Sequence, residues 1–183
     1  MIDSQLRPSG VNAAFVLRRM GEVPRERFVP QGRAAIAYVD RAVPLDNGRW
    51  LASPVAQGMM LQEALPKPGD RVLLVDGGSG YMAELLRPLV GSLDLIDPVA
   101  GAQGQVPGSG YTLLVVDGAV EQLPAALIAH LAPDARIVTG QASKGVTRLA
   151  VGRVAGGAAA LLPVAELGIP VFSEFAAPKR WSF

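Results

Sequence analysis

A glycine-rich turn directly follows a buried-strand pattern in the middle of the chain. Residues 72–75 are an apolar run, residues 76–80 read Asp-Gly-Gly-Ser-Gly, and an apolar helical pattern resumes at Tyr81. Because glycine has no Cβ, the backbone of such a turn can bend tightly and let a ligand approach closely. The first N–H groups of the next helix would then face a polar or anionic group. The pattern indicates a nucleotide or cofactor crevice, although turns of this kind also use glycine for geometry alone.

A second acidic residue, Asp117, ends another apolar run at 113–116. Ligands of open α/β sheets bind at the carboxyl ends of the strands, so an acid there could contact a cofactor or an acceptor. Asp117 and Gly118 are also an ordinary turn pair, and we favour the turn.

Other reactive side chains are scarce. The chain has no cysteine, which excludes disulfides, thiolate nucleophiles and cysteine metal sites, and its single histidine is His130. His130 lies near the end of an apparent helix over 120–131, where a cation can interact with the last carbonyl groups. We favour that role over a catalytic one, and no metal site is predicted.

These residues are positioned by alternating strand and helix patterns. We expect strands at 72–75, 93–96, 113–116 and 137–139, and helices at 81–89 and 120–131. This alternation predicts a parallel sheet covered by helices. Residues 97–111 show no periodicity and are expected to form a loop. The runs at 147–154 and 158–162, around Gly156 and Gly157, predict an antiparallel hairpin at the sheet edge.

The sequence predicts that the N-terminal part, residues 1–65, is mostly helical. We expect a helix over 11–20, short helices between the prolines that follow, and a turn at Asn47 and Gly48. Ser53 followed by Pro54 is a good start for a helix over 55–65.

The composition of the chain limits the number of domains and the classes of partner that we expect. The 183 residues include 17 basic and 16 acidic side chains, and half of all residues are hydrophobic. We therefore expect one domain over 1–183, with a helical N-terminal cap at 1–65 and a core at 66–183. The basic side chains are scattered, which argues against a nucleic-acid partner. With no signal peptide and no apolar span of ~20 residues evident, we expect no membrane contact and a cytoplasmic location.

Several segments, in order along the chain, resemble the protein-L-isoaspartate O-methyltransferase family. The specific ones are 23–30 (Val-Pro-Arg-Glu-Arg-Phe-Val-Pro), 67–73 (Lys-Pro-Gly-Asp-Arg-Val-Leu) and 78–81 (Gly-Ser-Gly-Tyr). The resemblance implies an α/β fold with a Rossmann-like S-adenosylmethionine methyltransferase sheet, a helical N-terminal cap and a C-terminal antiparallel edge. It also implies S-adenosylmethionine as cofactor, a protein or peptide carboxylate as substrate, and carboxyl methylation of isoaspartyl residues in protein repair.

By this resemblance, the cofactor would be held at the strand ends and in the glycine-rich turn, by Asp76, Gly77, Gly78, Gly80, Asp97 and Asp117. The family's acidic residue before the turn aligns with Leu74, so we expect Asp76 to reach the methionine end of the cofactor. The family's ribose-binding carboxylate aligns with Leu95, and Asp97 is expected to substitute for it. Residues 98–110 are too few for the family's next crossover and strand.

The acceptor segment departs from the family as well. Where the family reads Ile-Ser-x-Pro-His, residues 51–55 read Leu-Ala-Ser-Pro-Val. Ala52 replaces the serine and Val55 replaces the histidine. Ser53 carries the remaining hydroxyl and is the candidate catalytic residue, although we favour its role as a helix cap.

Three functions stay open. The first is an S-adenosylmethionine-dependent isoaspartyl methyltransferase. The second is a catalytically inactive relative that keeps the fold as a scaffold or interaction module, with a homodimer as one form. The third is a methyltransferase with a different acceptor. Because a carboxylate is already a nucleophile at pH 7, methyl transfer depends mostly on positioning, so an altered site can still work.

The C-terminal residues are rich in aromatic side chains, with Phe172, Phe175, Trp181 and Phe183. This density predicts docking onto the sheet or onto a partner chain, and we favour the sheet.

Overall fold

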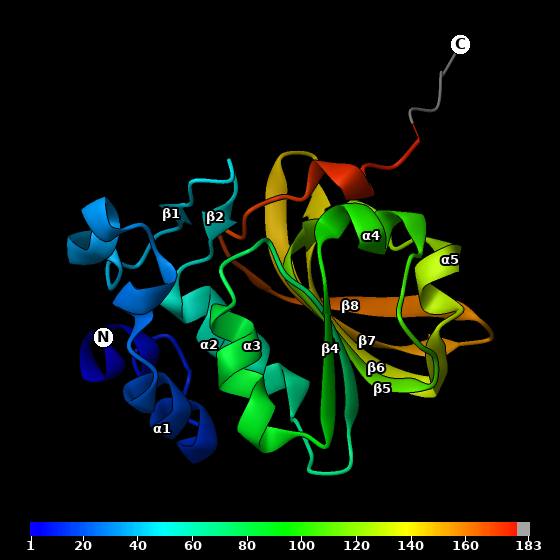
Figure 1. The fold of residues 1–183 in the computed structure, drawn as a ribbon, viewed down its shortest axis with the longest axis horizontal. Coiled ribbons are helices and arrows are strands. Elements are labelled where there is room, and N and C mark those ends of the chain that lie inside the picture. The colour runs from blue at the N-terminus through cyan, green and yellow to red at the C-terminus, as the bar shows by residue number, and fades with distance from the viewer. Residues whose placement is uncertain (179–183) are drawn as a thin grey trace.

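The computed structural model describes residues 1–178, and the main feature of these residues is a six-stranded sheet (Figure 1). The strand order is β4-β3-β5-β6-β7-β8. Pairing is parallel from β4 to β6, whereas β7 and β8 are added antiparallel. The strands are β3 (Arg71–Val75), β4 (Ser92–Ile96), β5 (Tyr111–Val120), β6 (Leu131–Ser143), β7 (Val146–Ala155) and β8 (Ala158–Glu166). This confirms the predicted α/β class, with its parallel sheet and antiparallel edge.

Helices cover both faces of the parallel strands (Figure 1). On one face lie α1 (Ala14–Glu22), α2 (Pro54–Ala64) and α3 (Tyr81–Leu86), and on the other lie α4 (Pro98–Gln103) and α5 (Ala125–Ile128). The apolar runs at 72–75 and 113–116 are completely buried between these layers. Strands that are buried on two faces need apolar residues at every position, which is why these two strands could be predicted from the sequence.

Short elements make up the rest of the N-terminal region. They are a π-helical turn (Ile2–Leu6), two 3-10 helices (Arg25–Phe28 and Gln31–Ile36) and a hairpin of β1 (Val43–Pro44) and β2 (Trp50–Leu51). The predicted Asn47–Gly48 turn closes the hairpin, with Gly48 at φ +76°. The predicted cap of α2 is also present, because Ser53 Oγ accepts a hydrogen bond of 3.2 Å from the N–H of Ala56.

Residues 98–103 form α4, so the prediction of a loop was wrong there. Asp97 caps this helix by accepting a hydrogen bond of 2.9 Å from the N–H of Ala100. Pro98 occupies the first turn, and Gly104 ends the helix at φ +69°. The start and stop signals were present in the sequence, but the small residues between them carry too little apolar periodicity to indicate a helix.

The helix predicted over 120–131 is shorter than expected, because β5 continues to Val120 and α5 begins only at Ala125. Asp117 and Gly118 therefore lie inside a strand and do not form the turn that we favoured. β5 pairs with β6 on both sides of a register shift between Val116 and Ala119. This pairing with β6 outweighs the local turn preference of an Asp-Gly pair.

The C-terminal segment docks beside the end of β5, shown in red in Figure 1. Phe172 and Phe175 are each 2% exposed, which confirms the predicted aromatic docking for these two residues. The other two aromatic residues of that prediction, Trp181 and Phe183, lie outside the described residues. Across residues 1–178, no helix is long and apolar enough to cross a membrane.

Candidate functional site

The three predicted acids each follow or end an apolar run of neighbouring strands at the carboxyl edge of the sheet, with β3 in the middle. The last residue of β3 is in register with Ile96 of β4 and with Val116 of β5. The next residue on each chain segment is an acid: Asp76, Asp97 and Asp117. The register of the strands thus brings residues that are far apart in the sequence to one edge of the sheet. In open α/β sheets this edge is where ligands bind.

The carboxylate of Asp76 folds back onto the glycine-rich turn. Its Oδ2 accepts hydrogen bonds from the N–H groups of Gly78 (2.8 Å) and Gly80 (3.0 Å), and Ser79 Oγ donates to Oδ1 over 3.3 Å. Gly78 and Gly80 have φ angles of +96° and +74°, which favour glycine. Asp76 thus holds the turn in shape, and these two amides donate to the chain's own carboxylate.

Asp117 presents an unpaired oxygen next to Asp76. The side chain is 5% exposed, and Oδ2 accepts a hydrogen bond of 2.7 Å from Gln57 Nε2. Oδ1 is buried and has no hydrogen-bond partner within residues 1–178. Burial, and secondly the charge of Asp76, raise the pKa of Asp117 to about 7. A buried oxygen without a partner is rare, and this one can accept a hydrogen bond from a ligand.

A buried arginine fixes the orientation of this acid. Arg25 donates hydrogen bonds to Gln57 Oε1 and to the carbonyl groups of Ala52 and Ala37. Its guanidinium carbon lies 5.0 Å from the centre of the Tyr81 ring. Because arginine can only donate, the Gln57 oxygen must face Arg25 and the Gln57 NH₂ must face Asp117. Oδ2 of Asp117 is therefore an acceptor, and any proton on this carboxyl sits on Oδ1.

Sequence reasoning missed both Arg25 and Gln57. Arg25 lies in a segment with Glu26 and Arg27 that reads as a solvated charge cluster. Gln57 gives a weak signal, as a polar residue among apolar ones in the predicted helix at 55–65. What shows their role is that both are completely buried and hydrogen-bonded to each other.

The remaining predicted residues lie in different surroundings. Asp97 is exposed and caps α4. Ser53 lines a surface hollow of about 350 Å³ together with Asp40 and Glu166, and its hydroxyl caps α2. His130 Nδ1 lies 2.7 Å from the carbonyl oxygen of Gly108, near the amino end of β5 and away from the acids.

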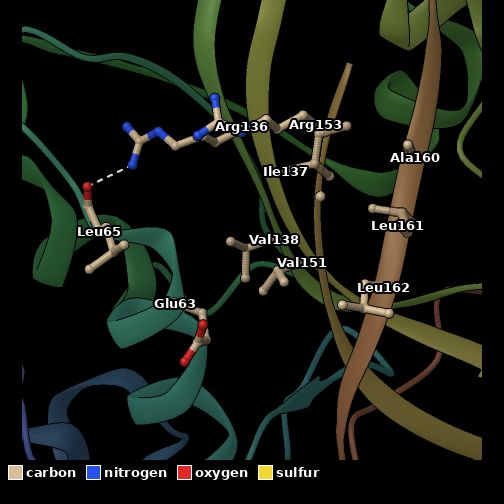
Figure 2. A pocket seen from close by; sticks show the side chains of 11 residues that line it. Glu63, Leu65, Arg136, Ile137, Val138, Val151, Arg153, Ala160, Leu161 and Leu162 are labelled. Atoms are coloured by element: carbon tan, nitrogen blue, oxygen red, sulfur yellow. Dashed lines mark hydrogen bonds between the residues drawn. The ribbon is translucent and has the colours of Figure 1, made fainter. Parts of the chain in front are cut away.

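A groove of about 580 Å³ crosses the antiparallel part of the sheet beyond α2. Figure 2 shows Glu63 and Leu65 on one side and Leu161 and Leu162 on the other, with Arg136 bonded to the carbonyl group of Leu65. The predicted site residues are not among those that line this groove. The chemistry that we infer therefore belongs to the carboxyl edge.

Two phenylalanines pack over that edge. A Cβ on Gly118 would lie 2.4 Å from the ring of Phe172, and a Cβ on Gly77 would lie 3.2 Å from the same ring. A Cβ on Gly101, in α4, would lie 3.0 Å from the ring of Phe175. Gly77, predicted from the resemblance to approach a cofactor, is thus covered by the chain's own C-terminal segment.

The fold and sequence are similar to those of known proteins. The family model for protein-L-isoaspartate(D-aspartate) O-methyltransferase matches residues 1–99. A protein-L-isoaspartate O-methyltransferase of Gloeobacter violaceus is 32% identical over 162 residues, which cover 75% of this chain and 79% of the relative. One from an Anaeromyxobacter species is 31% identical over 175 residues, or 82% and 72% of the two chains.

Solved structures agree on the fold. A putative protein-L-isoaspartate O-methyltransferase from Plasmodium falciparum, solved in complex with S-adenosyl-L-homocysteine, superposes with a TM-score of 0.71. It is 16% identical, and the match covers 92% of this chain and 95% of that one. Together with the match over residues 1–99 and relatives above 30% identity, this places the chain in the protein-L-isoaspartate(D-aspartate) O-methyltransferase family.

Proposed function

We propose that this protein transfers the methyl group of S-adenosylmethionine to the carboxylate of isoaspartyl residues in proteins or peptides. Membership in the family supports the reaction, and it favours an enzyme over the inactive scaffold. The structural observation that carries the proposal is the unpaired, buried oxygen of Asp117 beside Asp76.

The chemistry of these residues fits one end of the cofactor well. S-adenosylmethionine, when bound, supplies an electrophilic methyl group on a positively charged sulfur, and its methionine part also carries an ammonium group. Two adjacent carboxyl groups attract such positive charge, and Asp117 Oδ1 is free to accept a hydrogen bond from it. Asp97 keeps one carboxylate oxygen beyond its helix cap, which suits ribose hydroxyls.

The protein's own contribution to the reaction is positioning and charge. A substrate carboxylate needs no base to become nucleophilic at pH 7, so a general base is unnecessary. Arg25 and Gln57 hold Asp117 in one orientation, and the buried surroundings strengthen its interaction with a cation. Asp76 holds the turn that separates β3 from α3.

The acceptor segment supports a second candidate, a methyltransferase with a different acceptor. The carbonyl group of Ala52 accepts from Arg25, and the hydroxyl of Ser53 accepts from the backbone of Ala56. In this arrangement Ser53 is a structural cap, so its predicted catalytic role is not needed for either candidate. The cytoplasmic location and the homodimer stay predictions.

Calorimetric titration with S-adenosylhomocysteine tests the cofactor. We expect the wild-type protein to bind and Asp117→Asn to bind about 10- to 100-fold more weakly, because a hydrogen bond to a charged group is lost. Asp134→Asn is the matched control, since Asp134 is an exposed acid near the amino end of β6, away from the carboxyl edge, and the affinity of this variant should be unchanged. No binding to the wild type or the control would overturn the proposal.

Two peptides that differ only in an isoaspartyl or an aspartyl linkage test the acceptor. We expect methyl incorporation into the isoaspartyl peptide alone. Cofactor binding without methylation of that peptide would favour the second candidate.

A further inference from the structure

The C-terminal segment closes the carboxyl edge of the sheet. We call residues 170–175 the strap. The strap lies beside the end of β5, where the carbonyl group of Pro170 accepts from the N–H of Ala119 over 2.7 Å and the N–H of Phe172 donates to the carbonyl group of Ala119 over 2.8 Å. A further bond of 3.2 Å joins the N–H of Gln122 to the carbonyl oxygen of Phe175. The strap is thus attached by backbone hydrogen bonds to the strand that carries Asp117.

The two rings of the strap pack against the glycine-rich turn after β3, the end of β5, and α4. Phe172 packs on Gly77 and Gly118, at distances that only a residue without Cβ allows at Gly118. Phe175 packs on Gly101 of α4, the helix that follows β4, and belongs to the same buried cluster as Val75. The nucleoside part of a ligand that runs from the glycine-rich turn to Asp97 needs this same space. Both rings are 2% exposed, so no free volume for a nucleoside remains where they lie.

An ion pair fastens the strap to the N-terminal hairpin. Arg49 Nη2 lies 2.6 Å from Glu174 Oε1, and the Arg49 guanidinium carbon lies 5.6 Å from the centre of the Phe172 ring. The two charged side chains are 24% and 23% exposed, so water and salt reach the pair. An ion pair of this kind contributes about 1 kcal/mol or less, so its removal loosens the strap while the backbone hydrogen bonds and the two buried rings still hold it.

We propose that the strap is an autoinhibitory lid, which occupies the nucleoside part of the cofactor site and is displaced when S-adenosylmethionine or S-adenosylhomocysteine binds. This proposal rests on the proposed function, because it assigns the site to that cofactor. Asp76 and Asp117 are both buried when the lid is closed, and Arg49 and Glu174 are its latch. The apparent association constant for the cofactor is then the intrinsic constant multiplied by the fraction of molecules whose lid is open.

The latch variants Arg49→Ala and Glu174→Gln test the lid through affinity. Each weakens the closed form, so each should bind S-adenosylhomocysteine more tightly than the wild type, by about two- to fivefold. Arg148→Ala is the matched control, because it removes another arginine–glutamate pair, with Glu166, at the β7–β8 edge. Its affinity should equal that of the wild type. Latch variants that bind no more tightly than this control would overturn the lid.

Hydrogen exchange provides a readout that does not depend on activity. Saturating S-adenosylhomocysteine should speed exchange at the N–H groups of Phe172 and Gln122, since both bonds belong to the closed strap. Unchanged or slower exchange at these amides in the bound wild type would show that the strap stays in place, which overturns the lid alone. If neither the wild type nor the latch variants bind S-adenosylhomocysteine, the proposed cofactor and the lid are overturned together.

Discussion

Gln57 donates a hydrogen bond of 2.7 Å to Asp117, and its own amide oxygen accepts from the buried Arg25. The amide therefore links a permanent positive charge to a carboxyl group whose pKa is raised to about 7. Arg25 and Asp117 do not form a direct salt bridge, and the proton of Asp117 is confined to the oxygen that has no partner in residues 1–178. This arrangement determines how the site responds to pH and to ligands.

Asp117 should make the protein less stable as pH rises from about 4 to about 7. Its pKa is raised from the ordinary value of 3.8 to about 7 in the folded state, so the folded protein binds more protons than the unfolded chain over this range. The contribution to the free energy of unfolding falls by up to ~1.4 kcal/mol per pH unit and is constant above the folded pKa. Urea unfolding at pH 5 and pH 7 measures it. Asp117→Asn should remove this part of the pH dependence and Asp134→Asn should keep it; equal pH dependence in all three proteins would contradict the assignment.

Binding of S-adenosylhomocysteine should release protons near neutral pH. A cationic ammonium group at Oδ1 lowers the pKa of Asp117, so a carboxyl group that is partly protonated at pH 6.5 loses its proton on binding. Calorimetry in two buffers of different ionisation enthalpy measures the number of protons released. We expect a fraction of a proton at pH 6.5, and much less at pH 8.5. The same number at both values would mean that another group titrates.

Gly118→Ala should loosen the strap, because the new Cβ would lie 2.4 Å from the ring of Phe172. We expect a loss of about 1–3 kcal/mol in the free energy of unfolding, as for other overpacked interiors. Gly69→Ala is the control, because a Cβ at Gly69 meets nothing within 4 Å. Adding Phe172→Ala should make Gly118→Ala nearly neutral, and a double-mutant cycle measures this coupling. Additive effects would show that the two residues do not interact.

Ser53→Ala separates the cap from the catalytic role. The variant loses the hydrogen bond to the N–H of Ala56 and should be less stable by about 1 kcal/mol. Ser53→Asp, which keeps a cap acceptor, should restore most of that stability. Cofactor affinity and the turnover of the folded variant should match the wild type. A large fall in turnover with unchanged stability would instead make Ser53 a catalytic residue.

The sequence predicted those parts of the fold that local patterns encode. Apolar runs located β3 and β5, and Ser-Pro located the start of α2. Residues 98–103 escaped prediction because Gly and Ala give no apolar period. The length of β5 also escaped, because it depends on pairing with β6 and with Val171, which are distant in sequence.

The candidate site was predictable in its residue types but not in its connections. Asp76, Asp97 and Asp117 could be placed at one edge because strand ends of a parallel sheet meet there. The hydrogen bonds of Gln57 and Arg25 could not be foreseen, since they depend on how the N-terminal helices pack on the sheet. The C-terminal aromatic docking was foreseen, but its place over Gly77 and Gly118 required the structure.

Arg25 also couples local unfolding of the N-terminal helices to the ionisation of Asp117 in the sheet. It reaches from the N-terminal 3-10 helix to α2, and through Gln57 to β5. If the N-terminal helices open as a unit while the sheet stays folded, Asp117 becomes hydrated and titrates like an ordinary carboxyl group. The ionisation of Asp117, a single side chain in the sheet, can therefore report on the opening of the N-terminal helices, for instance in an NMR titration of its carboxyl group.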